Sequence, residues 1–259
     1  MNSTGCLECD ARARVRGSEV VRLLLGSAVL SAGLIAAAPI CIAADAWDGS
    51  LGATSDYLMR GISRSNGRAA LQLDLHYMSN SGIIAGLFAS NTQIDPSEPT
   101  DVEVSGFLGF AWNAGNDWHG KALASHYAYP WNRAGKRYDY DELDVDLAYQ
   151  EWLDITFAYS PDAPRFLSYR GLFGAVSESA EVNVQRPVFG KLSATAGIGY
   201  SHLGGPDATG YVYGSVGAAY DLAPFSLAVS YVNTSAGAKA LFYNAAASNR
   251  WTGTIIWRF

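Results

Sequence analysis

The stretch from Arg250 to Phe259 constrains the fold more than any other part of the chain. Its residues alternate between apolar and polar side chains, with Ile256 as the exception, as in a strand that has one apolar face. The apolar face carries Trp251, Gly253, Ile255, Trp257 and Phe259, and the polar face carries Arg250, Thr252, Thr254 and Arg258. In a water-soluble sheet such a strand would be an adhesive open edge, which remains the alternative reading. In a closed barrel it would pair with the first strand, so we predict a barrel.

The same ending resembles the strand by which outer-membrane barrels are recognised for assembly. An aromatic residue stands last, and apolar residues stand at alternate positions before it. We therefore expect Trp251, Gly253, Ile255, Trp257 and Phe259 to form an assembly signal that is read by the barrel assembly machinery.

The N-terminal region reads as an export signal. Four arginines within residues 1–22 precede an uncharged run from Leu23 to Ala44 that is rich in Leu, Ala and Gly. We predict a signal peptide at residues 1–43 and one mature domain at residues 44–259. The run is also long enough for a retained transmembrane anchor, which is the alternative. All three cysteines, Cys6, Cys9 and Cys41, lie in the predicted signal peptide.

Charge and composition exclude several classes of function. Removing the signal peptide takes four basic and three acidic residues from totals of 18 and 24, which leaves a formal charge of −7. A nucleic-acid partner is disfavoured by that charge. Four scattered histidines without cysteine give no metal-site spacing, and no glycine loop for phosphate precedes a helix. We expect neither a metal nor a cofactor.

The mature chain reads as an all-β, transmembrane, antiparallel β-barrel of about twelve strands. Apolar residues alternate in window after window, and tyrosine or tryptophan often closes the stripe, as an interfacial girdle requires. Tight connections alternate with long ones rich in Gly, Ser, Asn, Asp and Pro. The alternative is a soluble sandwich. The predicted strands are 47–59, 69–78, 83–91, 101–112, 118–129, 140–149, 152–160, 178–186, 191–202, 209–221, 225–233 and 249–259.

One stretch also carries a family resemblance. Residues 54–67, Thr-Ser-Asp-Tyr-Leu-Met-Arg-Gly-Ile-Ser-Arg-Ser-Asn-Gly, followed by Ala70-Leu71-Gln72, resemble the proteobacterial Gcw_chp or TorF-type porin family. Weaker echoes follow at residues 86–91, 127–130 and 157–162. The resemblance implies a Gram-negative outer-membrane barrel with a porin-like role, unsettled substrate and no catalytic residues. The chain departs from the family pattern at Pro161 to Ser177, which leaves the role of that loop open.

If the apolar stripes face lipid, the opposite faces line an interior in which acids outnumber bases. The small residues Ala148, Ala158, Gly197 and Gly199 share it, so side chains need not plug it. The predicted pore-lining residues are Asp56, Arg60, Gln72, Asp74, His76, Glu103, Glu142, Asp144, Asp146, Asp154, Glu181, Arg250 and Arg258. Twelve strands should leave a narrow passage, and acidic walls favour cationic or neutral small solutes. The alternative is a closed structural barrel, in which Arg60, Arg250 and Arg258 neutralise Asp56, Asp74 and their neighbours.

Two features leave further alternatives open. The connection from Arg60 to Arg68 concentrates three arginines; it could fold inward toward an anionic solute or lipopolysaccharide phosphates, but a solvated turn is the simpler reading. Asp74 and His76 share one face and are the only local pair with the geometry for a lipid-modifying barrel enzyme. The alternative is a histidine that is hydrogen-bonded in a polar interior and has no catalytic role. Outer-membrane lipid, lipopolysaccharide and small-molecule solutes complete the expected partners.

Overall fold

The computed structural model describes residues 46–94, 101–131, 138–163, 175–204, 209–242 and 245–259. The predicted signal peptide lies outside these residues, as does most of the loop from Pro161 to Ser177. Most of the described chain consists of β-strands.

Twelve of these strands form a closed antiparallel barrel, as the sequence predicts. Neighbours in sequence are neighbours in the barrel, apart from the short strands β2 and β3 between β1 and β4. The barrel strands are β1 (Ala46–Thr54), β4 (Ala70–Met78), β5 (Ile83–Thr92), β6 (Asp101–Ala114), β7 (Trp118–Ala128), β8 (Tyr140–Tyr149), β9 (Leu153–Ala163), β10 (Ala175–Phe189), β11 (Leu192–Leu203), β12 (Thr209–Leu222), β13 (Phe225–Thr234) and β14 (Arg250–Arg258).

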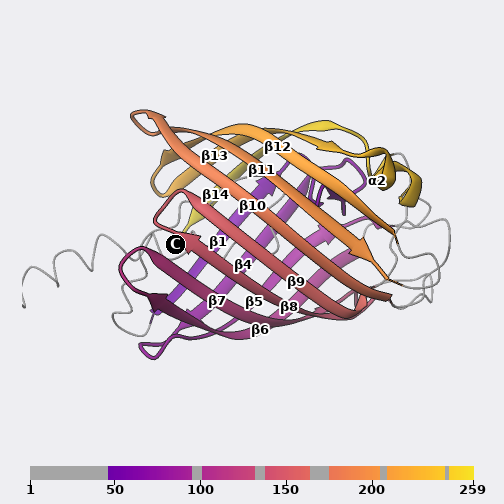
Figure 1. Cartoon of the computed structure of the whole chain (residues 1–259). Coiled ribbons are helices and arrows are strands. Elements are labelled where there is room, and N and C mark those ends of the chain that lie inside the picture. The colour runs from indigo at the N-terminus through magenta and orange to yellow at the C-terminus, as the bar shows by residue number, and fades with distance from the viewer. Residues whose placement is uncertain (1–45, 95–100, 132–137, 164–174, 205–208, 243–244) are drawn as a thin grey trace, which may run out of the picture.

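Pairing of the first strand with the last closes the barrel. β1 pairs with β14 on one side, where Ser50 lies opposite Arg258, and with β4 on the other, where Ala46 lies opposite Met78. The strands that form the wall are steeply tilted relative to the barrel axis (Figure 1). Because lipid offers no hydrogen-bond partner to a backbone, such closure is what allows a sheet to span a membrane.

The connections alternate in length as predicted, and they place α2 at one end of the barrel. Tight turns such as Ser79–Gly82 join strands at the end where β14 finishes, whereas the connection from β13 to β14 holds the helix α2 (Ala236–Leu241) at the opposite end (Figure 1). In the ranges that the structure describes, no helix has the length and apolar character needed to cross a bilayer.

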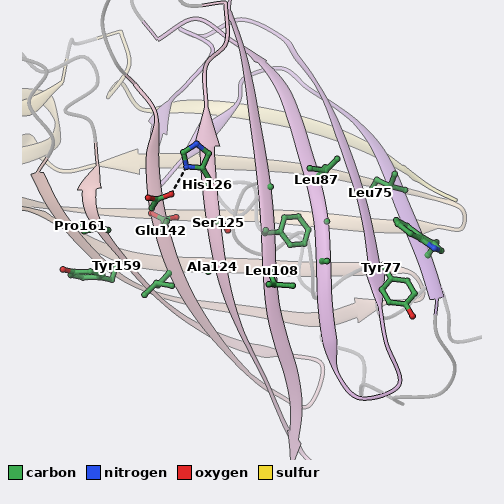
Figure 2. A pocket seen from close by; sticks show the side chains of 17 residues that line it. Leu75, Tyr77, Leu87, Leu108, Ala124, Ser125, His126, Glu142, Tyr159 and Pro161 are labelled. Atoms are coloured by element: carbon green, nitrogen blue, oxygen red, sulfur yellow. Dashed lines mark hydrogen bonds and ion pairs between the residues drawn. The ribbon is translucent and has the colours of Figure 1, made fainter.

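The outer wall is apolar along the predicted stripes. Aromatic pairs such as Trp47 with Tyr77 and Tyr231 with Trp251 lie on it, with ring centroids 5.4 and 5.3 Å apart. A groove over β1 and β4 to β9 has an apolar lining to which the exposed His126 contributes (Figure 2). Asp141 also lines the groove, and its Oδ1 lies 2.7 Å from His126 Nδ1. The predicted assembly residues also face outward: Trp251, Ile255, Trp257 and Phe259 are exposed, and no side chain approaches Gly253. Their role in assembly stays a prediction.

The prediction for the first strand is wrong beyond Thr54. The first predicted strand runs to residue 59, so its alternation puts Tyr57 and Met59 on the lipid face, but both side chains are buried inside the barrel. The wall strand ends because the Thr54 hydroxyl donates to the Asp56 carbonyl oxygen, 2.9 Å away, in a local turn. The chain then enters the lumen.

Gly86 of β5 offers a test of lumen packing. A methyl group there would meet Phe107 at 2.3 Å and the Cβ of His76 at 2.7 Å, whereas a methyl at Gly253 on the outer wall would meet nothing within 4 Å. We expect Gly86→Ala to lower the free energy of unfolding by about 1–3 kcal/mol through overpacking, and Gly253→Ala to leave it nearly unchanged. Urea unfolding of the two variants in detergent, followed by tryptophan fluorescence, measures the difference. Equal stabilities would contradict the packing around Phe107.

Candidate functional site

A hairpin inside the lumen is the centre of the candidate site. The strands β2 (Leu58–Met59) and β3 (Ile62–Ser63) pair with each other, and we call residues 56–65 the lumen hairpin. The prediction of a solvated turn is wrong for this part of the arginine-rich connection, because Ile62, Ser63 and Arg64 are buried. The inward fold of the alternative reading is observed, whereas contact with an anionic solute or with lipopolysaccharide phosphates stays a prediction. Arg68, at the end of the connection, is exposed.

The base of the hairpin is fixed around the Asp56 carboxylate. The hydroxyl groups of Ser63 and Ser65 donate to Asp56 Oδ1 at 2.6 and 2.8 Å, and the Arg250 guanidinium donates to Oδ2. Asp56 is buried, and these donors compensate for the loss of water around its charge. The predicted contact between the first and last strands is thereby confirmed for Asp56 and Arg250. It ties the hairpin to β14.

A second anchor joins the hairpin to β6 and β7. The Tyr57 hydroxyl donates to Glu103 at 2.7 Å, and Arg64 donates to the Tyr129 hydroxyl at 2.9 Å while its Nη1 lies 3.7 Å from Glu103. Burial, followed by the nearby Glu103 charge, raises the pKa of Tyr57 well above its usual value. Tyr57 therefore remains a neutral donor to the carboxylate.

The tip of the hairpin places Arg60 against the wall at β8. Its Nη2 lies 2.8 Å from Glu142 Oε2 and 4.0 Å from Asp144 Oδ1. Burial alone would lower the pKa of Arg60, but Glu142, Asp144 and the nearby Tyr213 and Tyr140 together outweigh burial and raise it. The guanidinium is therefore a permanent charge inside the barrel, and its partners are wall carboxylates of the same protein.

An aromatic cluster fills the space around the tip. Tyr127 and Tyr140 stack with ring centroids 4.5 Å apart, and Met59 and Ile62 pack in the same cluster as Tyr213 of β12. Phe242, after α2, completes the far side of the cluster. The expectation of an interior free of plugging side chains is therefore wrong at this level. Tyr213 also covers Gly199, where an added methyl group would lie 2.3 Å from its ring.

Carboxylates follow one another along the adjoining wall. Glu142, Asp144 and Asp146 alternate along β8, and Asp154 of β9 and Glu181 of β10 face the same space; we call these five residues the acidic ladder. The bases beside the ladder in the described ranges are Arg60 and Lys121, whose Nζ lies 3.3 Å from Asp146 Oδ2. The Tyr213 hydroxyl donates to Glu181 at 2.6 Å. Acids outnumber bases on this side of the lumen.

The wall at β4 carries the remaining predicted residues. His76 Nδ1 lies 2.6 Å from Asp74 Oδ1, and both side chains are buried, as is Gln72. His76 Nε2 has no hydrogen-bond partner within the described part of the chain. Arg258 donates to the Ser226 hydroxyl near the end with tight turns. The expected neutralisation by arginine therefore holds for Asp56, whereas the close partner of Asp74 is His76.

All thirteen predicted lining residues thus face the interior, although Asp56 and Arg60 do so from the lumen hairpin instead of a wall strand. That these residues line the path of a permeating solute stays a prediction. Sequence reasoning missed Lys121, even though His119, Lys121, Leu123, Ser125 and Tyr127 alternate in the same phase along β7 and all are buried. Strand periodicity also gives no contacts to Arg64, because it says nothing about a connection, and the inward fold is only an alternative reading of that connection.

Water has little access to these side chains. The exposed fractions are 0% for Glu103 and His76 and 1% for Lys121, and the Asp144 side chain is also 1% exposed. Searched over the described ranges, no three His, Cys, Asp or Glu side chains are arranged to hold a metal ion. The site is therefore an internal network of acids, bases and tyrosines that closes around the hairpin tip.

Solved structures share this barrel. The chain resembles the NanC porin with 11% identity and a TM-score of 0.52, covering 82% of this chain and 98% of that one. It also resembles the COG4313 outer membrane channel from Pseudomonas putida F1 with 14% identity and a TM-score of 0.50, covering 84% and 96% of the two chains. At these identities the likeness shows the fold alone. No curated protein matches the sequence.

A family model matches residues 42–257, which is nearly all of the predicted mature chain. The model is described as a bacterial protein of unknown function, Gcw_chp. The match confirms the resemblance seen at residues 54–67 and shows that it extends across the whole barrel. This chain belongs to the Gcw_chp family.

Proposed function

We propose that this protein is a porin-like channel of the bacterial outer membrane that passes small cationic or neutral solutes. The observation that carries the proposal is the acidic ladder, which faces the lumen with fewer bases than acids beside it. Rings or rows of carboxylates concentrate cations in a narrow passage and repel anions. A channel of twelve strands lies between the filled barrels of eight strands and the wide pores of sixteen or more.

Burial of the charged side chains in the lumen supports a closed resting conformation for this channel. Solvent hardly touches Glu103, Lys121 or Asp144, and a passage for ions needs water beside its charged groups. Conduction therefore requires the hairpin tip to leave the ladder. We accordingly expect brief, small conductance steps instead of a permanently open pore. This low exposure is also what favours the second candidate, a closed structural barrel.

Export through the periplasm and contact with outer-membrane lipid follow from the same proposal. The exposed apolar wall, including the groove in Figure 2, suits acyl chains, and the exposed His126 and Asp141 in its lining suit a polar boundary. Lipopolysaccharide and the barrel assembly machinery remain expected partners on this basis.

Selectivity is tested by removing two charges of the ladder. In planar bilayers under a salt gradient, the refolded protein should give a cation-leaning reversal potential. The double variant Asp144→Asn, Asp146→Asn should bring that potential closer to zero, because two buried negative charges are lost. Asp141→Asn, an exposed position on the outer face of the same strand, is the matched control and should behave like the unaltered protein. An unchanged potential in the double variant would rule out selection by the ladder, and an absence of conductance would rule out the channel.

A lipid-modifying enzyme is the alternative that the pair of His76 and Asp74 raises. A hydrolase needs a nucleophile beside the free ring nitrogen, and it needs lipid to reach that point. His76 is fully buried in the lumen, with no partner on Nε2 among the described residues. We expect purified protein in phospholipid micelles to release no more fatty acid than its His76→Gln variant. Release by the unaltered protein alone would overturn the non-enzymatic proposal.

A further inference from the structure

The turn of the lumen hairpin contains Arg60 at a position where turn geometry favours a smaller residue. Arg60 and Gly61 lie between β2 and β3 with φ values of 52° and 76°, in the left-handed region. Two-residue hairpin turns of this kind favour Asn or Asp followed by Gly, because a larger side chain is strained at positive φ. Gly61 meets the preference and Arg60 does not. The arginine therefore has to be explained by what its side chain contacts.

Those contacts lie across the lumen from the hairpin's own base. The guanidinium reaches Glu142 and Asp144 on β8, at the top of the acidic ladder. The backbone of the tip reaches β12 and β13, because an added methyl at Gly61 would lie 2.7 Å from Tyr213 Cβ and 2.9 Å from Thr234 Cγ2. The tip thus occupies the space between the wall at β8 and the wall at β12.

The two parts of the hairpin are held differently. At the base, Asp56 accepts from two serines and Arg250, and the backbone N–H of Ser63 donates to Ala246 at 2.9 Å. At the tip, the Arg60 guanidinium contacts Glu142 and Asp144, the Tyr140 hydroxyl donates to Met59 Sδ at 3.8 Å, and Met59 and Ile62 add apolar packing. Loss of the Arg60 charge would leave Glu142 and Asp144 buried without their neighbouring cation, a state that favours entry of water.

We infer that Arg60 is the residue that determines selectivity and closure of this channel. Its positive charge, which is carried by the hairpin and not by the wall, neutralises the first two carboxylates of the acidic ladder while the tip blocks the lumen. When the tip moves away, the same carboxylates line the passage. This inference rests on the proposed channel function, and the tests below separate the two.

The first test is electrical. Arg60→Gln should raise the open time in planar bilayers at least tenfold and move the reversal potential further toward that of a cation-selective pore. Arg60→Lys should retain most of the unaltered behaviour because it keeps the charge. Arg68→Gln is the matched control, since Arg68 lies just beyond the same hairpin but is exposed. Values for Arg60→Gln that equal those of Arg68→Gln would overturn the inference and leave the channel standing.

The second test needs no conductance. The predicted mature chain has no cysteine, so Ser160→Cys gives a single thiol. Ser160 is fully buried on β9, and because Leu143 pairs with Tyr159, it lies at the level of Glu142. A charged, water-soluble thiol reagent should label this cysteine at least tenfold faster when Arg60→Gln is added. Arg68→Gln should not change the rate.

The outcomes distinguish the two proposals. Faster labelling without conductance in any variant would overturn the channel and retain the role of Arg60 in closing the lumen. Unchanged labelling would overturn that role. If Arg60→Gln does not reach the heat-modifiable folded form, Glu142→Gln removes the same ion pair from the wall side and should accelerate labelling in the same way.

Discussion

Backbone hydrogen bonding between β1 and β14 is the constraint on which the rest of the structure depends. Each of the remaining barrel strands lies between two strands that are close to it in sequence, but the first and last strands meet only when the barrel closes. Without that seam, two strand edges would carry unpaired donors and acceptors into lipid, at a cost of several kcal/mol for each group. Closure also defines an inside. The inward side chains can then be polar because the barrel wall separates them from lipid.

The side chains that fill the lumen balance one another's charges as well as occupying its volume. Lys121 lies beside Asp146, Arg64 beside Glu103, and Arg60 beside Glu142, so each of these buried acids has a basic neighbour. Tyrosines supply further neutral donors to Glu103 and Glu181. The arrangement differs from that of an apolar core because it can exchange protein partners for water or solute if the hairpin moves. Polarity of the lumen is therefore compatible with both closure and conduction.

The wall of this barrel can be predicted from sequence, whereas the contents of its lumen cannot. Alternation along β4 or β8 assigns a face to every residue, because successive side chains of a strand point to opposite faces. Once the apolar residues are placed toward lipid, the polar residues between them must face the lumen. This assignment fails at Tyr57 and Met59, where alternation continues after the strand has ended. The burial of Arg64 depends on Glu103 and Tyr129, which are distant in sequence and share no pattern with it. Lys121 could have been found by extending the alternation of β7.

The bond between Asp56 and Arg250 links residues 194 positions apart, and it lies at the seam between the two ends of the barrel. Asp56 is also the residue that organises the hairpin base through Ser63 and Ser65. The hairpin therefore lacks one of its anchors until the last strand has arrived. In a growing barrel the contacts with Glu103 and Glu142 are available before β14 arrives, whereas the base of the hairpin is completed only when the seam forms, so full anchoring of the hairpin coincides with closure of the barrel.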